Sequence, residues 1–461
     1  MKKAPDVFVI AFALIVLAAL ATWLLPGGSY QRQQEKVGDT VREMVVPGTF
    51  QVEPNQPQIG KIFLAPILGF ARMVNIIALI FLVGGAFNIL NDTGAIAAGI
   101  HQLVKALRHR TYLIIPIVMT VFSFLGGAYG MCEEAIPFAL IFVPLALALG
   151  YDSLVGICLS FVAAGVGFAA GFLNPFTVQI SQGIAGVPLG SGIGYRLIVW
   201  TAATALAVAW VMVYAARIKA DPTRSPMYDL DQARRVELGK AEVAQSTFTW
   251  RHGLCLLVLL AAVVGLIIGT TVWKWYMVEF AGLFLGMGVL AGIAAGMHPN
   301  TIAKSFVTGA KDIASAALIV AFAGGIIVIL ENGHILDTIL FGLASVTSRV
   351  GGVLAAQTMY LLQFILNFFI PSGSTKAVLT MPLLAPLADL SGITRQTLVL
   401  AYQLGSGFSS MIIPTSGVTV GTLALAKIPY ERWVRWHWPL QAVFVLFSLA
   451  VLVWPALTRW N

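Results

Sequence analysis

Charged side chains are scarce in this sequence of 461 residues. Asp, Glu, Lys and Arg make up 10% of the chain, 58% of the residues are hydrophobic, and the mean hydropathy is +0.87. A soluble domain carries about 25% charged residues. The composition therefore excludes a soluble protein and predicts a polytopic membrane protein. The net charge of +8 does not indicate nucleic-acid binding, because the basic residues lie in short loops beside apolar runs and form no stripe.

The sequence also lacks motifs of metal-binding, catalytic and nucleotide-binding sites. The three cysteines, Cys132, Cys158 and Cys255, lie in apolar stretches without metal-site spacing or a disulfide framework, and the six histidines are scattered. The sequence has no Walker loop and no GxGxxG motif after a strand. We therefore expect neither an enzyme nor an ATP-driven pump, and no cofactor other than a candidate Na⁺.

Apolar runs long enough to cross a bilayer, about 20 residues each, recur along the chain. They predict simple spanning helices at residues 7–25, 74–91, 195–215, 253–273, 276–296, 314–330 and 437–455. Short connecting helices are predicted at residues 61–72 and 301–312. Two longer runs, 153–186 and 395–427, contain Asn174-Pro175 and Pro414-Thr415-Ser416. Proline removes a backbone donor and clashes with the preceding turn, so each of these two runs is predicted to be a broken helix.

Two further stretches, 112–149 and 352–390, each contain two apolar arms around a polar, glycine-rich tip. Loops rich in Lys and Arg stay cytoplasmic. Besides Lys2-Lys3, the basic clusters lie at residues 105–110, 216–252 and 432–435. All of them are cytoplasmic only if both stretches enter and leave the membrane on one side. The charges therefore predict about nine spans and two re-entrant hairpins in a bacterial inner membrane, with the N-terminus cytoplasmic and the C-terminus outside.

Two alternatives to this topology stay open. The first apolar run resembles a cleaved signal peptide as well as a spanning helix. A marginal helix at residues 95–107 would change the number of spans. The first alternative leaves the topology argument unchanged, because both readings place the next segment outside.

The two halves of the chain repeat each other. The matching pairs are Gly69 with Gly309, Gly84-Gly85 with Gly324-Gly325, Pro144 with Pro386, Gly150 with Gly392, Gly165 with Gly405, Gly167 with Gly407, and Pro175 with Pro414. Interruptions at corresponding places in two apolar halves are typical of secondary transporters and indicate the binding site. Since the span 74–91 is predicted to run inward and its mate 314–330 outward, we predict inverted repeats. The repeats are residues 1–215 and 253–461, joined by a cytoplasmic linker at 216–252.

Polar residues gather at the four interruptions. Non-helical backbone at membrane depth is tolerated only where it is buried in protein or lines a wet cavity. Free N–H groups at a helix break attract an anion, and free carbonyls coordinate Na⁺. The candidate substrate ligands are Glu133, Glu134, Asn174, Thr177, Ser372, Ser374, Thr375, Thr415 and Ser416. A Na⁺ site is expected near Asn174, Ser374 and Thr415, with helix capping as the alternative role for each hydroxyl.

The adjacent Glu133 and Glu134 are the most informative pair in the sequence. Two carboxylates inside an apolar run cost several kcal/mol unless they are paired or protonated, and an intramembrane charge suggests a function by default. They would bind a cationic group of the substrate, bind Na⁺ or carry a coupling proton. The alternative is a structural ion pair with Lys376 on the other tip. Asn91-Asp92 and Glu331-Asn332, at the ends of matching spans, are expected to be caps and interface residues.

Five motifs resemble the YfcC-like family of the ion transporter superfamily. They are GAYGMCEEAIPF (127–138), ALGYDS (148–153), GFLNPFTVQISQGIAGVPLGSG (171–192), NFFIPSGSTKAVLTMPLLAPLADL (367–390) and IIPTSGVT (412–419). The resemblance implies an all-α membrane protein in which hairpin tips and helix breaks form the substrate and sodium sites. It also implies a homodimeric scaffold and an elevator-type mechanism. Relatives are labelled either C4-dicarboxylate carriers or basic amino acid antiporters.

The tips depart from the Ser-Asn-Thr pattern of better-known dicarboxylate carriers. One tip has Cys132-Glu133-Glu134, and two acidic side chains repel a dianion. We therefore predict a secondary active transporter of an amino-acid-like, in particular basic, solute, coupled to Na⁺ or H⁺ or working by exchange. The alternatives are a C4-dicarboxylate symporter, whose glutamates would hold cations, and a channel, which would not need two broken motifs of opposite orientation.

Overall fold

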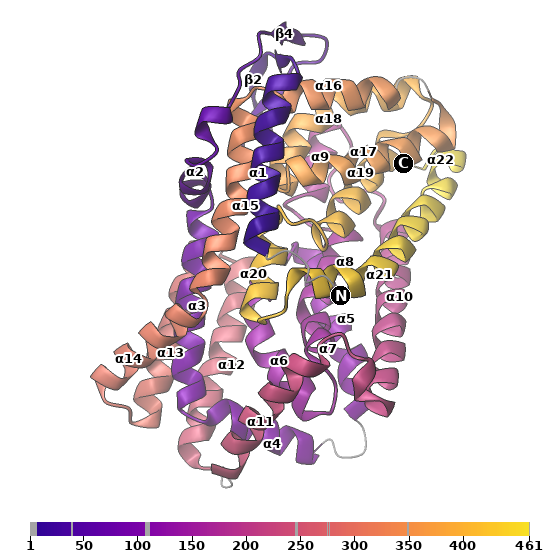
Figure 1. Ribbon diagram of the computed structural model, residues 1–461. Helices are drawn as coiled ribbons and strands as arrows, with labels where there is room; N and C mark the ends of the chain where they lie inside the picture. The colour runs from indigo at the N-terminus through magenta and orange to yellow at the C-terminus, as the bar shows by residue number, and fades with distance from the viewer. Residues whose placement is uncertain are drawn as a thin grey trace.

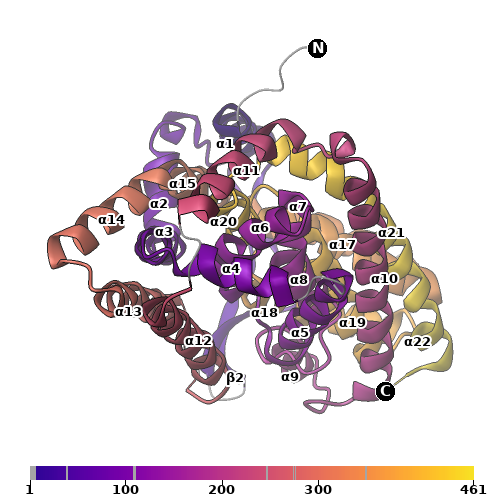
Figure 2. The same ribbon diagram turned by 90° about the horizontal axis from the view of Figure 1, so that it is seen from below.

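The computed structural model describes residues 7–37, 40–106, 111–244, 248–273, 275, 277–347 and 350–460 and is mostly helical (Figures 1 and 2). The basic pair Lys2-Lys3 and residues 107–110 of the second basic cluster lie outside these residues. Short strands and α16 lie at one end of the molecule, and α4 and α11 lie at the other (Figure 1).

The helices of the described residues follow one another in this order. The first helices are α1 (Val7–Leu24), α2 (Ala65–Arg72), α3 (Val74–Asp92), α4 (Ala95–Ala106), α5 (Ile114–Tyr129), α6 (Ala139–Ala148), α7 (Ser153–Ile157), α8 (Ala163–Ala169), α9 (Val178–Ile184) and α10 (Ile193–Ala220). The later ones are α11 (Tyr228–Ala244), α12 (Trp250–Thr271), α13 (Met277–Ala295), α14 (Pro299–Asp312), α15 (Ala314–Asn332), α16 (Leu336–Thr347), α17 (Gly352–Phe369), α18 (Gly373–Leu390), α19 (Arg395–Ser410), α20 (Gly417–Leu425), α21 (Tyr430–Val451) and α22 (Val453–Thr458). Short helical turns are η1 (Ile59–Lys61), η2 (Thr111–Leu113), η3 (Glu133–Phe138), the π-helical η4 (Cys158–Val162) and η5 (Pro222–Arg224).

Six helices in the described part are long and apolar enough to cross a membrane. They are Val74–Asp92, Thr111–Tyr129, Ile193–Ala220, Met277–Ala295, Gly352–Phe369 and Tyr430–Thr458. A bent pair, Pro299–Asp312 with Ala317–Asn332, would make a seventh. The protein is therefore a multi-pass membrane protein, as its composition predicts. The predicted spans 7–25, 253–273 and 314–330 are helical as α1, α12 and α15, but none of them is among the six.

The predicted interruptions appear as gaps between helices. The chain is not helical from Ala170, after α8, to Thr177, before α9, a segment that contains Pro175. It is again not helical between Ser410 and Gly417, around Pro414. The short helices predicted at 61–72 and 301–312 are present as α2 and α14, and the marginal helix at 95–107 is present as α4.

The expectation of an all-α fold is wrong for residues 27–53. Strand β1 (Gly27–Ser29) pairs with β4 (Gln51–Glu53), and β2 (Arg32–Val37) pairs with β3 (Thr40–Val45), both antiparallel. The dipeptide between β2 and β3 in the sequence, Gly38-Asp39, is a hairpin signal that the sequence analysis did not use. The guanidinium of Arg32, with Nη2 2.9 Å from Oδ2 of Asp337, attaches the strands to α16.

Glycines that match between the halves lie where helices approach closely. A Cβ on Gly167 of α8 would lie 1.9 Å from the carbonyl oxygen of Ser123 on α5. A Cβ on Gly405 of α19 would lie 2.6 Å from the carbonyl oxygen of Tyr360 on α17. In each half, the helix before the break therefore packs against the first helix of the hairpin stretch: α8 against α5, and α19 against α17. Only glycine permits this backbone distance.

A reciprocal contact joins the two halves through α2, α3, α14 and α15. A Cβ on Gly69 of α2 would lie 2.2 Å from the backbone nitrogen of Gly325 on α15, and one on Gly309 of α14 would lie 2.5 Å from the carbonyl oxygen of Gly84 on α3. The hydroxyl of Ser305 on α14 donates to Oδ2 of Asp92 at 2.6 Å. The expected interface role of Asp92 is thus seen.

The two ends of each hairpin stretch lie close together. At the first stretch, Nζ of Lys219 donates to the hydroxyl of Thr111 at 3.3 Å and lies 5.4 Å from the ring centre of Tyr151. At the second, the backbone N–H of Gly352 donates to the carbonyl of Ser391 at 2.9 Å. Helices α5 and α6 lie in the lower part of Figure 1 and α17 and α18 in the upper part.

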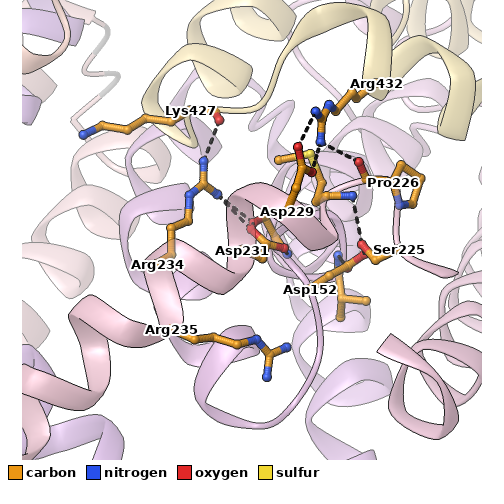
Figure 3. Close-up of polar contacts among 12 residues, drawn as sticks. Asp152, Ser225, Pro226, Asp229, Asp231, Arg234, Arg235, Lys427 and Arg432 are labelled. Atoms are coloured by element: carbon orange, nitrogen blue, oxygen red, sulfur yellow. Dashed lines mark hydrogen bonds and ion pairs between the residues drawn. The ribbon is translucent and has the colours of Figure 1, made fainter. Parts of the chain in front are cut away.

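The linker contains an ordered helix, α11, which binds to both halves (Figure 3). The carboxylate of Asp231 accepts from the backbone N–H of Ser153 at 2.8 Å, which ties α11 to the start of α7. Arg234 donates through Nη2 to the carbonyl of Lys427 at 2.5 Å, which ties it to the loop after α20. Arg432 forms an ion pair with Asp229, and its hydrogen bond lowers the pKa of that carboxyl to about 2.

Candidate functional site

A cavity of about 610 Å³ lies where the tips of the two hairpin stretches meet. Seven of the nine predicted ligands line it: Glu133, Glu134, Thr177, Ser372, Ser374, Thr375 and Ser416. Residues separated by more than 200 positions in the chain thus share one cavity. The other two, Asn174 and Thr415, are fully buried outside its lining.

The first tip follows from a glycine that ends α5. Gly130 has φ +75°, and its N–H closes the last turn onto the carbonyl of Gly126 at 3.0 Å. This left-handed cap turns the chain sharply, so that Glu133 begins the helical turn η3. The carboxylate of Glu134 accepts from the N–H of Cys132 at 2.9 Å and is 3% exposed. One hydrogen bond satisfies few of the acceptor sites of a carboxylate, and Glu134 lies on the cavity wall.

The second tip is the start of helix α18. Residues Ile370 to Ser372 separate α17 from α18, and the hydroxyl of Ser372 donates to the hydroxyl of Thr375 at 3.0 Å. The carbonyl of Gly373 accepts from the hydroxyl of Tyr402 on α19. The first N–H groups of a helix carry a partial positive charge that favours an anion. Glu133 and Glu134 therefore share a cavity with a helix N-terminus.

The two predicted ligands that do not line the cavity form hydrogen bonds with backbone groups instead. Oδ1 of Asn174 accepts from the N–H of Phe176 at 2.9 Å and of Thr177 at 3.2 Å. The hydroxyl of Thr415 donates to the carbonyl of Phe368 at 2.8 Å. The capping alternative describes Ser416 instead, whose hydroxyl accepts from the N–H of Thr419 at 3.4 Å at the start of α20. The Na⁺ site expected near Asn174, Ser374 and Thr415 stays a prediction, since only Ser374 of the three lines the cavity.

The buried hydroxyl of Thr177, near the second tip, has no hydrogen-bond partner within the described residues. A Cβ on Gly373 would lie 2.7 Å from Cγ2 of Thr177 and 3.8 Å from the hydroxyl of Tyr402. Buried polar groups are seldom left unpaired, and each exception calls for an explanation such as an ion or a water. Thr177 lines the cavity, so its hydroxyl oxygen is available to a ligand.

The lining also includes the polar residues Asn367, Ser406 and Ser410, which the sequence analysis did not single out. Nδ2 of Asn367 donates to the carbonyl of Ser406 at 3.0 Å and to the hydroxyl of Ser410 at 2.9 Å. The sequence did contain a signal, because Ser406 and Ser410 are four residues apart and lie on one face of a helix that leads to a break.

The ion pair considered between Lys376 and the glutamates is absent from the contacts of the described residues. Nζ of Lys376 donates instead to Oδ1 of Asn367 at 2.6 Å and to the carbonyl of Gln363 at 3.2 Å. Both partners belong to α17, the other arm of the same hairpin stretch. The two tips are thus not held together by that pair.

Cys132 offers a test of access to the cavity. It lines the cavity and is partly exposed, whereas Cys158 and Cys255 are fully buried and act as internal controls. We expect a membrane-impermeant maleimide to label Cys132 from one side of the membrane only, and a bound solute to slow the labelling. The measurement is the labelling rate in right-side-out and inverted vesicles. Labelling at an equal rate with and without solute would place the tip away from the binding site.

The comparisons with known proteins cover almost the whole chain. It matches the family of C4-dicarboxylate anaerobic carriers (DcuC) over residues 4–456. A protein of Escherichia coli (strain K12) named "Putative basic amino acid antiporter YfcC" is 38% identical over 485 residues, covering 97% of this chain and 96% of that protein. An uncharacterized protein of Haemophilus influenzae is 30% identical over 490 residues, with the same coverage of 97% and 96%.

Two solved structures also align over most of the chain. One is MtrF of Neisseria gonorrhoeae, described with a class of antimetabolite efflux pumps, at 17% identity over 98% of this chain and 95% of that chain. The other is the YdaH transporter of Alcanivorax borkumensis, at 16% identity over 98% of both chains. Both have a TM-score of 0.42. At this score neither likeness carries an inference about this chain.

Proposed function

The chain belongs to the family of C4-dicarboxylate anaerobic carriers and is therefore a membrane transporter, and from this premise we propose the solute and the mechanism. The protein is a secondary active transporter of a small amino-acid-like solute, with a basic amino acid as the leading candidate. Transport is coupled to Na⁺ or H⁺ or proceeds by exchange. It takes place across the bacterial inner membrane, and no chemical conversion accompanies it.

The observation that carries this proposal is the pairing of opposite electrostatic features in one cavity. The first tip contributes Glu133 and Glu134, and the second contributes the N-terminus of α18 at Gly373. An amino acid has a cationic and an anionic group, so its amino group matches the first tip and its carboxylate the second. The volume of about 610 Å³ lies in the range of small-molecule sites, roughly 300–1,000 Å³.

The proposed mechanism is alternating access by two inverted repeats, residues 1–215 and 253–461, joined by the linker 216–252. In it, 112–149 and 352–390 are re-entrant hairpins that open to opposite sides. The contacts that join the two ends of each stretch support this arrangement, as does the cavity between their tips. The hairpins and broken helices would move as one body against a homodimeric scaffold, elevator-fashion, with the N-terminus cytoplasmic and the C-terminus outside.

A second candidate is a C4-dicarboxylate symporter, favoured by the description of the family that the chain matches. In that case Glu133 and Glu134 would hold cations that accompany the dianion. Two carboxylates beside a dianion repel it unless cations intervene, so this candidate requires a cation for binding. That requirement separates the two candidates experimentally.

The test is a thermal-unfolding screen of the purified protein with basic and neutral amino acids, dicarboxylates and monocarboxylates, each with and without Na⁺. A ligand that binds only the native state at about 100 times its Kd adds about 2.7 kcal/mol of stability. We expect L-arginine or L-lysine to raise the Tm. Stabilisation by succinate only when Na⁺ is present would support the second candidate, and no stabilisation by any of these solutes would contradict both.

A further inference from the structure

Lys376 is a fully buried lysine in the second hairpin stretch. Its ammonium is 0% exposed and donates to Oδ1 of Asn367 at 2.6 Å and to the carbonyl of Gln363 at 3.2 Å. Nζ also lies 5.7 Å from the ring centre of Tyr402. Within the described residues, neither aspartate nor glutamate is among its partners. A buried ammonium without a carboxylate costs several kcal/mol, so its presence at this place calls for a functional reason.

The surroundings of this ammonium are those of a bound monovalent cation. Amide and carbonyl oxygens hold alkali cations at membrane depth, and an aromatic ring adds a favourable face for a positive charge. Lysine carries its charge as a compact ammonium at the end of a flexible stem. Lys376 therefore places a covalently attached cation in a shell of neutral oxygens.

The repeat shows that this position is not arbitrary. The same shift of 242 residues pairs Pro144 with Pro386, Gly150 with Gly392 and Glu134 with Lys376. The two halves thus carry opposite charges at one repeat position, just after each tip. Both side chains are buried, at 3% and 0% exposure.

One side chain separates the ammonium from the cavity. Asn367 lines the cavity and accepts from Lys376 through Oδ1, while its Nδ2 donates to Ser406 and Ser410 on the same wall. The positive charge orients the Asn367 amide and adds to the partial charge at the N-terminus of α18. Electrostatic interactions of this kind are strong where water is excluded.

We propose that Lys376 is a resident monovalent cation of the second hairpin, which replaces the Na⁺ that a carboxylate-binding tip would otherwise recruit. The inference rests on the proposed transport function and deepens it. It assigns the carboxylate of the solute to the second tip and makes its binding there independent of Na⁺. Glu134, at the equivalent position of the first half, is left to the cationic group of an amino acid or to a coupling proton.

The test is counterflow of radiolabelled L-arginine, and separately of succinate, in proteoliposomes with Na⁺ or with N-methyl-D-glucamine. We expect the wild-type rate to change by less than about twofold, which corresponds to about 0.4 kcal/mol. Lys376→Ala should lower the rate at least about tenfold without small cations, and Na⁺ or ethylammonium should restore part of it. Lys304→Ala, which removes an exposed lysine of α14, should behave as wild type under both conditions.

Three results would overturn the inference. One is a wild-type rate that requires Na⁺, which needs no variant and so does not depend on variant folding. Another is Lys376→Ala counterflow as fast as wild type without Na⁺. The third is a monodisperse Lys376→Ala protein that stays inactive with every small cation. Absence of wild-type counterflow and of any thermal shift with either probe would instead count against the proposed function.

Discussion

Glu134→Gln is expected to lower L-arginine counterflow by about tenfold to a hundredfold. Glutamine keeps the shape of the side chain, and its Oε1 can still accept from the N–H of Cys132, but the charge that faces the cavity is lost. Hydrogen bonds to charged groups are worth about 1.5–3 kcal/mol, and each 1.4 kcal/mol is a factor of about ten. The measurement is the initial counterflow rate per reconstituted protein, with the Tm of the variant measured in parallel.

Glu431→Gln provides the matched control, because it removes a carboxylate at the start of α21, outside the cavity lining. Its counterflow should remain within about twofold of wild type. If Glu134→Gln transports at the wild-type rate with unchanged dependence on pH and Na⁺, Glu134 is neither a solute ligand nor a coupling group.

Gly167→Ala should produce one of the largest losses of stability among the glycine-to-alanine substitutions. Its Cβ would lie 1.9 Å from the carbonyl oxygen of Ser123 and 2.6 Å from the carbonyl carbon. These are backbone atoms of α5, so relief of the clash requires α8 and α5 to separate. Overpacking of this kind costs about 1–3 kcal/mol or more. We expect a lower Tm in detergent and a smaller monodisperse fraction.

The control is Gly282→Ala in α13, where nothing lies within 4 Å of the added Cβ. Alanine favours a helix by about 1 kcal/mol over glycine, so this variant should be as stable as wild type or more so. A Gly167→Ala protein whose Tm equals that of wild type would show that α5 and α8 do not approach as closely as described.

Prolines and hydropathy made the helical framework predictable. Pro175 and Pro414 remove backbone donors, and both lie in the non-helical segments that follow α8 and α19. The apolar runs at 74–91 and 195–215 needed only their length to be recognised as spans. These are local properties of the chain, and neighbouring segments do not alter them.

The polar residues were predictable as a group but not one by one. Thr177 and Ser416 line the cavity, whereas Asn174 and Thr415, in the same two breaks, turn their oxygens to nearby backbone. Capping and ligand binding use the same side-chain oxygens. The direction of each side chain depends on packing against helices far away in the sequence, which no local pattern records.

The sequence by itself determined that this is a multi-pass membrane transporter, because composition, apolar run lengths and family motifs are properties of the chain alone. It also located the four interruptions and the glutamate pair. Only the tertiary structure decided that the two tips share one cavity, that Asn367 lines it, and that Lys376 bonds to the neighbouring helix α17 rather than to Glu134. The physical reason is that a buried charge takes whichever partners packing places within hydrogen-bond distance, and those partners come from separate helices.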